Sequence, residues 1–354
     1  MIRRGIGSAL AVAAVAGLVY TGAVVRDSAG PAPREESVAA TTSTVKVLTW
    51  NVCGESGGCR AQNQPDTQAA RIAGLATAKG ADAVFLQEVC GNDAENDKAH
   101  DPNKTADKSL VTLLGEKLPG WSVAFLPYTR PAESRFGTEV PVAPGATVPY
   151  PPRYPAAQAT SDFRCRGKDL IGVQGIAVAV KGTFGERQDY EFHSPKPGLF
   201  VKALCVRRTS GTPVRLCTGH LTPKGEDQDP RAGFSYRAEQ VLRFGELVGD
   251  GHDTVFGGDF NSRPPDDTKS PEDSTVLAPL YAKYRECEQG ASGTARKGSG
   301  TMWDDVAQDQ RTDRKYDYLF TKSSFGSCEV LTDPALAALS DHLPVIGTAT
   351  VTTG

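Results

Sequence analysis

The amino-acid sequence predicts one folded α/β domain behind an N-terminal leader. Of the 354 residues, 39% are hydrophobic and 23% are charged, which excludes a mainly disordered chain because so many apolar side chains can form a large core. From residue 45 onward, short apolar or β-branched runs alternate with helical patterns and polar loops, and no second linker divides the chain. The formal net charge of −3 excludes binding of nucleic acid by bulk charge alone, so any polyanion must be bound locally.

The first 25 residues have the layout of a secretory signal peptide. Arg3 and Arg4 precede an uncharged stretch, 6–25, that is dominated by Ala, Val, Leu and Gly. The small residues Thr21 and Ala23 predict cleavage after Ala23, although a stretch of this length could also remain as an uncut anchor. We therefore expect a secreted protein or, alternatively, a membrane-anchored one that faces outside.

Residues 26–43 are rich in Ala, Pro, Ser, Thr and Glu and predict a flexible linker. The domain is expected over residues 44–352. Its predicted strands cover 45–50, 83–86, 176–180, 254–256, 318–320 and 345–351, and its predicted helices cover 66–79, with Asp66 as N-cap and Gly80 as the stop, and 235–248. Residues 127–157 contain eight prolines and predict an irregular surface excursion.

Eight cysteines in an exported chain favour disulfides over a metal–thiolate site. Cys205 and Cys217 lie on two apolar runs that are joined by a Ser-Gly-Thr-Pro turn, and folding this hairpin brings them within bridging distance. The sequence does not fix the remaining connectivity, and it leaves two further candidate pairs: Cys53 with Cys59, and Cys287 with Cys328.

Chemically active side chains occur at the ends of the predicted strands. They stand in six short motifs: Thr49-Trp50-Asn51, Gln87-Glu88, Gly219-His220, Gly257-Gly258-Asp259-Phe260-Asn261, Tyr316-Asp317-Tyr318 and Ser340-Asp341-His342. Each motif alone is modest evidence, because a strand-end carboxylate is usually exposed without a role and a single histidine is usually structural.

Taken in this order, the motifs resemble the endonuclease/exonuclease/phosphatase superfamily. This superfamily includes pancreatic-type deoxyribonucleases, abasic-site endonucleases, bacterial sphingomyelinases and inositol polyphosphate 5-phosphatases. The resemblance covers about residues 45–351 and implies a four-layered sandwich, in which two packed, mixed, mostly antiparallel β-sheets are flanked by helices. It also implies a metal-dependent phosphoric-ester hydrolase with its site at one end of the sandwich.

Hydrolysis of a phosphodiester requires neutralised phosphoryl oxygens, an activated water molecule and a protonated leaving group. Glu88 and Asp341 offer hard oxygen ligands for a divalent cation, and Asn51 is expected in the same shell. Mg²⁺ is the expected cofactor, with Mn²⁺ or Ca²⁺ as alternatives because all three accept oxygen ligands.

Asp259 and Asn261 are two residues apart, so in an extended segment their side chains project to the same side, although a simple turn is the alternative. The resemblance makes Asp259 the base that activates water and Asn261 a hydrogen-bond donor to the phosphoryl group. It also makes Asp317 the partner that orients His342, and it makes His220 a donor to the scissile phosphate or to the leaving oxygen.

Basic and aromatic residues near the proline-rich segment could form a substrate rim. The basic residues are Arg130, Arg153, Arg164, Arg166 and Lys168. The alternative is an ordinary solvated loop. Tyr128, Tyr154 and Trp303 could stack on bases or could instead pack in the core.

The resemblance leaves the substrate open. A nuclease that cleaves DNA or RNA is the leading hypothesis, since the pair of histidines resembles the deoxyribonuclease branch. A sphingomyelinase-type phospholipase C, a phosphatase of phosphorylated small molecules and an inactive surface-binding module are the alternatives. Abasic-site repair is disfavoured, because Cys53 occupies the place of an acidic residue in that branch. No obligate protein partner is evident.

Overall fold

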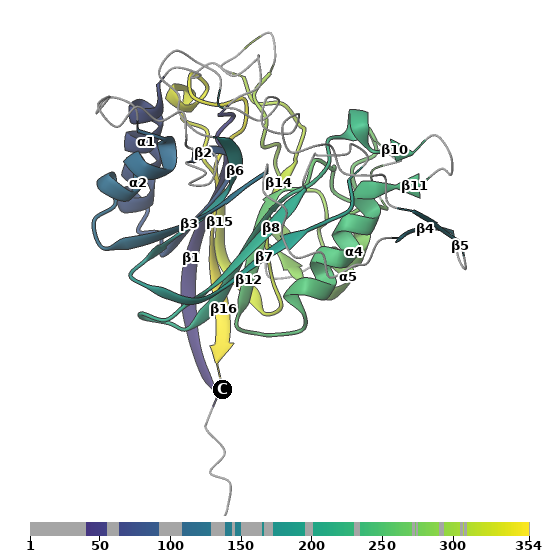
Figure 1. The fold of residues 1–354 in the computed structure, drawn as a ribbon, viewed down its shortest axis with the longest axis horizontal. Helices are drawn as coiled ribbons and strands as arrows, with labels where there is room; N and C mark the ends of the chain where they lie inside the picture. Colours follow the sequence, from purple (N-terminus) through teal and green to yellow (C-terminus); the bar gives the residue numbers. More distant parts are fainter. Residues whose placement is uncertain are drawn as a thin grey trace, which may run out of the picture. The chain divides into compact units, whose positions relative to one another are not determined.

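The computed structural model describes residues 40–54, 64–91, 108–128, 139–143, 146–149, 165, 173–194, 201–229, 234–270, 273, 275–289, 294–304, 307 and 310–353 (Figure 1). The described residues belong to one compact unit that begins at Ala40. The leader, 1–25, and most of the linker lie outside them. Within the described residues, no helix is long and apolar enough to cross a membrane.

The first sheet has six strands in the order β15–β16–β1–β2–β6–β3. Their bounds are β1 (Thr41–Asn51), β2 (Ala83–Gly91), β3 (Trp121–Pro127), β6 (Val173–Lys181), β15 (Ser324–Val330) and β16 (Val345–Thr353). Strands β1 and β2 are parallel, and every other neighbouring pair is antiparallel. Residues 41–43 had been expected in the linker but extend β1, because they pair with the end of β16.

The second sheet also has six strands, in the order β13–β14–β12–β9–β8–β7. Their bounds are β7 (Phe184–Glu191), β8 (Lys202–Arg208), β9 (Val214–His220), β12 (Thr254–Asp259), β13 (Arg285–Glu286) and β14 (Asp317–Thr321). Strands β9 and β12 are its parallel pair, and the other pairs are antiparallel. The prediction of two mixed, mostly antiparallel sheets is confirmed.

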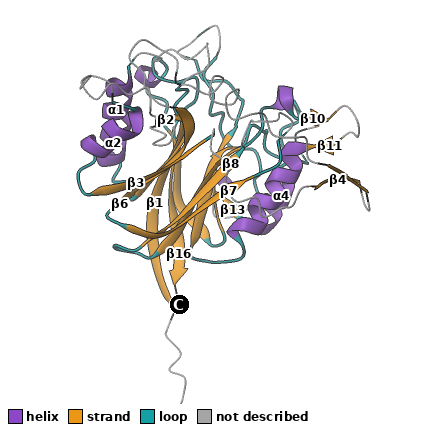
Figure 2. Cartoon of the chain, viewed as in Figure 1, coloured by secondary structure: helices purple, strands orange, loops and turns teal. Residues whose placement is uncertain are grey.

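Figure 2 shows helices on the outer sides of the two sheets, and the described residues contain four α-helices. They are α1 (Pro65–Ala78), α2 (Leu110–Lys117), α4 (Tyr236–Val248) and α5 (Ala278–Lys283), and three short 3-10 helices cover η2 (Lys224–Glu226), η3 (Cys287–Gln289) and η4 (Pro334–Leu336). One apolar cluster joins α1 and α2 to the first sheet, another joins α4 and α5 to the second, and a third fills the space between the sheets. This gives the four layers that the resemblance implied.

Helix α1 begins at Pro65, with Gln64 as N-cap, so the prediction of Asp66 as N-cap is wrong. Proline fits the first position of a helix because it needs no hydrogen-bond partner there, and Asp66 then lies in the first turn. The predicted stop at Gly80 is confirmed by its left-handed φ of 63°. Helix α4 begins after Ser235, whose side chain accepts a hydrogen bond from the Ala238 amide at 3.1 Å.

Two short hairpins complete the described structure. They consist of β4 (Glu139–Ala143) with β5 (Ala146–Pro149), and of β10 (Gln228–Asp229) with β11 (Phe234–Ser235). The first lies inside segment 127–157, so the expectation that this segment contains no regular element is wrong. Pairing tolerates its prolines because the hairpin is an isolated two-stranded ribbon, in which both strands are edges.

Two of the predicted disulfides are present. Cys205 pairs with Cys217 across β8 and β9, with a Cα–Cα distance of 4.1 Å, and Cys287 pairs with Cys328 at 5.4 Å. Cys53 is also disulfide-bonded, but its predicted partner, Cys59, lies outside the described residues. A further bridge between Cys90 and Cys165, which was not predicted, spans 75 residues of sequence.

Candidate active site

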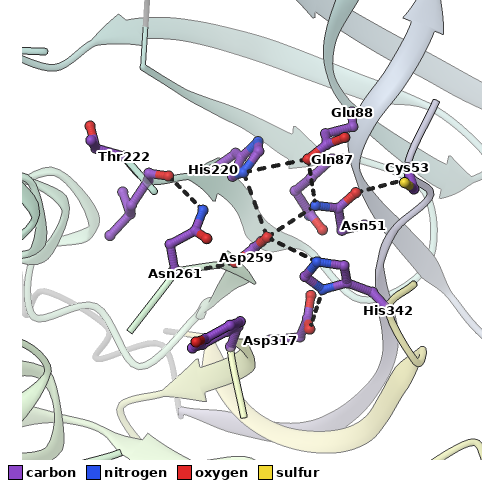
Figure 3. A network of polar contacts seen from close by, with 12 residues as sticks. Asn51, Cys53, Gln87, Glu88, His220, Thr222, Asp259, Asn261, Asp317 and His342 are labelled. Carbon is purple, nitrogen blue, oxygen red and sulfur yellow. Dashed lines mark hydrogen bonds and ion pairs between the residues drawn. The ribbon is translucent and has the colours of Figure 1, made fainter. Parts of the chain in front are cut away.

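The ends of the two parallel strand pairs meet at one edge of the sandwich. Asn51 is the last residue of β1, His220 ends β9 and Asp259 ends β12. Asp317 opens β14 directly opposite Asp259. Figure 3 shows these side chains pointing toward a common centre, together with Glu88 and His342. The structure therefore brings together residues from six separate sequence motifs.

The carboxylate of Asp259 lies at the centre of the group (Figure 3). Its Oδ1 accepts a hydrogen bond from the backbone N–H of Asn261 at 2.8 Å, and its Oδ2 accepts one from the side-chain Nδ2 of Asn51 at 3.0 Å. The Nε2 atoms of His220 and His342 each lie 3.6 Å from the same Oδ2. This buried carboxylate oxygen thus faces two imidazoles and one amide.

The Gly-Gly pair before Asp259 lets three strands approach closely. A Cβ on Gly258, whose φ is +135°, would lie 2.0 Å from the carbonyl oxygen of Gly219 in β9. A Cβ on Gly257 would lie 2.1 Å from the carbonyl oxygen of Tyr318 in β14. These glycines therefore allow Asp259 to sit between the strands that carry His220 and Asp317.

His342 forms a buried pair with Asp317. Its Nδ1 lies 2.8 Å from Asp317 Oδ2, and both side chains are almost inaccessible. Burial alone would lower the pKa of His342, but the carboxylates of Asp317, Asp259 and Asp341 outweigh burial and hold the pKa well above the usual 6.5. The neighbouring carboxylates therefore favour the protonated form of His342.

The Ser-Asp-His motif is locked onto the end of β1. Ser340 Oγ donates to the carbonyl oxygen of Asn51 at 2.7 Å and accepts from the His342 amide at 3.0 Å. The indole of Trp50 donates to the His342 carbonyl oxygen at 3.0 Å. The first and last motifs, nearly 300 residues apart in sequence, thus form one hydrogen-bonded unit.

Glu88 reaches the site because β2 is irregular at this residue. The pairing of β2 with β6 shifts between Leu86 and Val89, and Glu88 has a left-handed φ of 52°. Asn51 Nδ2 donates to its Oε1 at 3.0 Å. Burial raises the pKa of Glu88 above the usual 4.5, while His220 and Asn51 oppose the rise and Asp341 adds to it.

The acidic residues Glu88 and Asp341 suit a hard divalent cation. Asp341 Oδ1 is buried and accepts no hydrogen bond within the described part of the chain. Burial is the main cause of the raised pKa of Glu88, and repulsion by Asp341 adds to it. A cation would relieve both costs, because carboxylate oxygens are its preferred ligands.

The side-chain amide of Asn51 contacts the carboxylates of the site through its nitrogen rather than through its oxygen. Its amide nitrogen faces Glu88 and Asp259, whereas its Oδ1 accepts from the Cys53 amide at 2.9 Å. In the described geometry Asn51 is therefore a hydrogen-bond donor to the two carboxylates, and its expected part in a metal site stays a prediction. A second group has ligand atoms within 4.8 Å of one another and could also hold a metal: Asp259, Asp317 and His342.

Asn261 also adopts a left-handed φ, 48°, just after β12. The Nδ2 of Asn261 donates to the Leu221 carbonyl oxygen at 2.8 Å. The buried guanidinium of Arg237 donates to the backbone carbonyl oxygen of Asn261. Arg237 in turn pairs with Asp273 at 2.8 Å. The turn expected after β12 is therefore present, and the role of Asn261 toward a phosphoryl group stays a prediction.

Sequence reasoning missed two polar residues that support the site. Tyr128 Oη lies 2.7 Å from His220 Nδ1, and Gln87 Nε2 donates to Thr218 Oγ1 at 2.9 Å. Gln87 stands next to Glu88 in its motif, which was a usable signal, but Tyr128 had only the aromatic pattern. Both Tyr128 and Trp303 are buried, which favours core packing over base stacking for these two residues.

The residues expected to form a substrate rim stand in segments that the structure does not describe. Arg130, Arg153, Tyr154, Arg164, Arg166 and Lys168 all lie outside the described residues.

The chain is similar to known proteins in sequence pattern and fold. A family model described as the endonuclease/exonuclease/phosphatase family matches residues 48–342. No curated protein matches the chain in sequence.

Solved structures share the fold at low sequence identity. The endonuclease/exonuclease/phosphatase from Beutenbergia cavernae DSM 12333 has a TM-score of 0.56 and 18% identity, over 87% of this chain and 72% of that one. The D. rerio TDP2 complexed with single strand DNA product has a TM-score of 0.51 and 16% identity, over 88% and 100%. The Bacteroides vulgatus endonuclease/exonuclease/phosphatase has a TM-score of 0.53 and 13% identity, over 86% and 98%. The chain therefore belongs to the endonuclease/exonuclease/phosphatase family, whose members are phosphoric-ester hydrolases.

Proposed function

We propose that the chain is an exported, divalent-metal-dependent phosphodiesterase that hydrolyses DNA or RNA by direct attack of water. One observation carries the proposal: Asp259 Oδ2 lies 3.6 Å from the Nε2 atoms of both His220 and His342. A carboxylate between two imidazoles provides a proton acceptor beside two donors, which is the set that in-line hydrolysis of a phosphoric ester needs.

In this proposal Asp259 orients the attacking water and accepts its proton. The Asn261 amide holds Oδ1 in place, and Oδ2 remains directed at the centre of the site. Because Asp259 cannot rotate without losing that bond, its acceptor oxygen is preorganised.

His342 and Asn261 stabilise charge on the phosphoryl oxygens. The imidazolium of His342 is kept charged by Asp317 and is fixed by its backbone contacts with Trp50 and Ser340. His220 donates from Nε2 to the scissile phosphate or to the leaving oxygen.

Glu88 and Asp341 would hold a divalent cation, with Mg²⁺ expected and Mn²⁺ or Ca²⁺ as alternatives. When bound, such a cation neutralises charge on the phosphate and on its leaving oxygen. Asn51 supports this end of the site by holding Glu88 and Asp259 at 3.0 Å each.

Export is supported by the cysteines. The described residues contain three disulfides, and Cys53 is disulfide-bonded as well, which fits an oxidising compartment. Expression in a secretion-competent bacterium should release a mature chain that begins at Val24. Mass spectrometry of the medium checks this, and an intact N-terminus in the membrane fraction would support the uncut anchor instead.

The DNA-bound TDP2 structure makes a nucleic acid one reasonable substrate for this fold. The decisive experiment incubates the mature protein with plasmid DNA, single-stranded DNA, RNA, sphingomyelin vesicles and a sugar phosphate, with Mg²⁺ and with chelator. We expect cleavage of a nucleic acid with Mg²⁺ only, and loss of at least ~10²-fold in kcat for Asp259→Ala.

Other outcomes of this panel identify the alternatives. Release of phosphocholine alone would assign a sphingomyelinase-type phospholipase C, and release of phosphate from the sugar alone would assign a phosphatase. No turnover of any substrate would leave only a surface-binding module. Each of these three results overturns the nuclease proposal.

A further inference from the structure

The two histidines of the site have different partners on the nitrogen that faces away from Asp259. Nδ1 of His342 meets the carboxylate of Asp317 at 2.8 Å. Nδ1 of His220 instead meets the hydroxyl of Tyr128 at 2.7 Å. A carboxylate stabilises an imidazolium, whereas a neutral hydroxyl brings no charge. This difference indicates a specific role for Tyr128.

The direction of the Tyr128–His220 hydrogen bond follows from the other side of the ring. Nε2 of His220 faces Asp259 Oδ2 at 3.6 Å and Glu88 Oε1 at 4.0 Å. Ionised carboxylates can only accept hydrogen bonds, so in a neutral ring the proton belongs on Nε2. Nδ1 then carries a lone pair, and the Tyr128 hydroxyl is the donor.

Tyr128 is held firmly enough to impose this arrangement. It directly follows β3 at the edge of the first sheet, and its amide donates to the Gln174 carbonyl oxygen in β6 at 2.8 Å. Its ring is 4% exposed and packs in the apolar cluster between the sheets. His220 ends a strand of the opposite sheet, so the contact joins two independently anchored backbones.

We propose that Tyr128 is a positioning residue that fixes His220 as the Nε2–H tautomer and aims this N–H at the phosphate. This role rests on the proposed function, and it divides the work between the histidines: His342 stabilises charge beside Asp317, and His220 acts as a donor whose Nε2–H is oriented by Tyr128. Without the hydroxyl, the ring can rotate and can exchange tautomers, so fewer molecules present the N–H correctly.

The test determines the tautomer of His220 by ¹H–¹⁵N NMR of the imidazole rings in the full mature protein. The spectra are recorded in chelator, at a pH where the ¹⁵N chemical shifts identify His220 as neutral. The chain has five histidines, and His220→Asn assigns the relevant signals. We expect the Nε2–H tautomer in the wild type and a mixture of tautomers in Tyr128→Phe. An Nδ1–H tautomer in the wild type, or an unchanged tautomer in Tyr128→Phe, overturns the proposal.

Tyr284→Phe is the matched control. It removes a buried tyrosine hydroxyl that donates to the carbonyl oxygens of Gly245 and Gly249 at the end of α4. It should leave the NMR signals of His220 unchanged. A His220 change of equal size in this control would also count against a specific role for Tyr128. The wild-type spectrum assigns the tautomer even if Tyr128→Phe folds poorly.

Kinetics separate this inference from the proposed function. On the substrate found by the panel, Tyr128→Phe should lower kcat about 10-fold with KM nearly unchanged, as expected for the loss of one aligned hydrogen bond. If no substrate is turned over, the proposed function fails while the NMR result still decides the role of Tyr128. If the wild type is active but Tyr128→Phe keeps full kcat, the positioning role fails alone.

Discussion

In the described part of the chain, the non-glycine residues with a left-handed φ are Cys53, Glu88 and Asn261. All of them border the site, where such strain costs on the order of 1 kcal/mol each and must be held by the surroundings. At Glu88 the consequence is direct. Phe85 and Leu86 face opposite sides of the sheet, so a regular strand would turn Glu88 toward the helices with Leu86. The irregularity turns it into the site.

The Glu88 carboxylate should have opposite effects on activity and stability. Burial raises its pKa, so its charge destabilises the folded state at any pH above the folded pKa, and this cost vanishes below 4.5, where both states are protonated. Glu88→Gln keeps the shape without the charge. In chelator at pH 7 it should raise the midpoint of urea unfolding, with a smaller gain at pH 4, while kcat with Mg²⁺ falls at least ~10²-fold. A variant that is less stable at pH 7 would contradict this account of Glu88.

The His342–Asp317 pair predicts a defined pH dependence. Because the pKa of His342 is raised, the stabilising interaction is fully present below pH 6.5 and is lost as the pH rises through the folded pKa. Asp317→Asn removes the nearest negative charge. The alkaline limb of the kcat/KM profile should therefore move to lower pH, and kcat should fall about 10² to 10⁴-fold. An alkaline limb at the wild-type position would show that His342 is not the group titrating there.

The sequence predicts which side chains converge where each of them directly ends or opens a strand. His220, Asp259 and Asp317 were identified because each directly ends or opens a strand, and the order of their motifs resembles a known family. The contact of Tyr128 with His220 was not predicted, because 92 residues separate them and no local pattern connects a buried tyrosine with a distant histidine. The tautomer of a buried histidine depends on tertiary contacts, which local sequence does not specify.

At the scale of elements, a buried ion-pair cluster supports the strand that carries Asp317. Lys315, just before β14, is 1% exposed, and its ammonium lies 3.2 Å from Glu286 Oε1 in β13. It also contacts Glu288 in η3. Burial alone would lower the pKa of Lys315, but the two carboxylates raise it. This cluster fixes the start of β14 and thereby the partner of His342.

Lys315→Met should destabilise the fold by about 3 to 5 kcal/mol at neutral pH, because it leaves two carboxylates without their cation. Burial alone would raise the pKa of Glu288, but Lys315 outweighs burial and lowers it. The stabilisation of the fold by the Lys315–Glu288 pair is therefore present above pH 4.5, and it is lost as the pH falls through the folded pKa of Glu288. The destabilisation should therefore shrink in urea titrations at acidic pH.

Lys322→Met is the control for that experiment. It removes a lysine that is 3.3 Å from Asp250, in a pair whose aspartate side chain is 69% exposed. Such an exposed pair contributes little to stability, because water and salt screen its charges. An equally small effect of Lys315→Met would show that the buried cluster does not stabilise β14.

Element boundaries were predicted less well than element identities, for tertiary reasons. The apolar run of β2 predicted an end at Leu86, yet the strand continues to Gly91 because β6 pairs with it beyond the irregularity at Glu88. The prolines of 127–157 argued against strands, yet an isolated hairpin accepts them. In both cases the pairing partner, which local sequence does not specify, decides the outcome.

At the scale of the whole molecule, the two sheets share one plan. Each has six strands with a central parallel pair, β1 with β2 and β9 with β12, and both pairs end at the site. The buried amide of Gln87 joins the sheets beneath the site, because its Nε2 donates to Thr218 in β9 and lies 3.3 Å from Thr49 in β1. The sequence alone predicted six of these strands and the hairpin of β8 and β9, but not β3, β7 or β15, and the docking of the sheets came from the resemblance.

Because both sheets contribute residues to the site, binding of a cation there should be measurable as a change in the stability of the whole domain. A cation that binds only the folded chain stabilises it by about 2.7 kcal/mol at 100 times its Kd, which corresponds to a rise in Tm of roughly 5 °C for a domain of this size. Mg²⁺ should therefore raise the Tm of the mature protein in calorimetry, and chelator should reverse the rise. No substrate is needed, so the result is independent of which ester is hydrolysed.

Variants then decide where the cation binds. If it binds at Glu88 and Asp341, both Glu88→Gln and Asp341→Asn should lose most of the Mg²⁺-dependent rise, whereas Asp317→Asn should retain it. The opposite pattern would place the cation in the group of Asp259, Asp317 and His342, whose ligand atoms also lie close enough together. Asp333→Asn, which alters an exposed carboxylate paired with Arg71, should behave as the wild type. We expect the first pattern, because Asp341 Oδ1 is buried without a donor in the described structure, whereas His342 already holds Asp317.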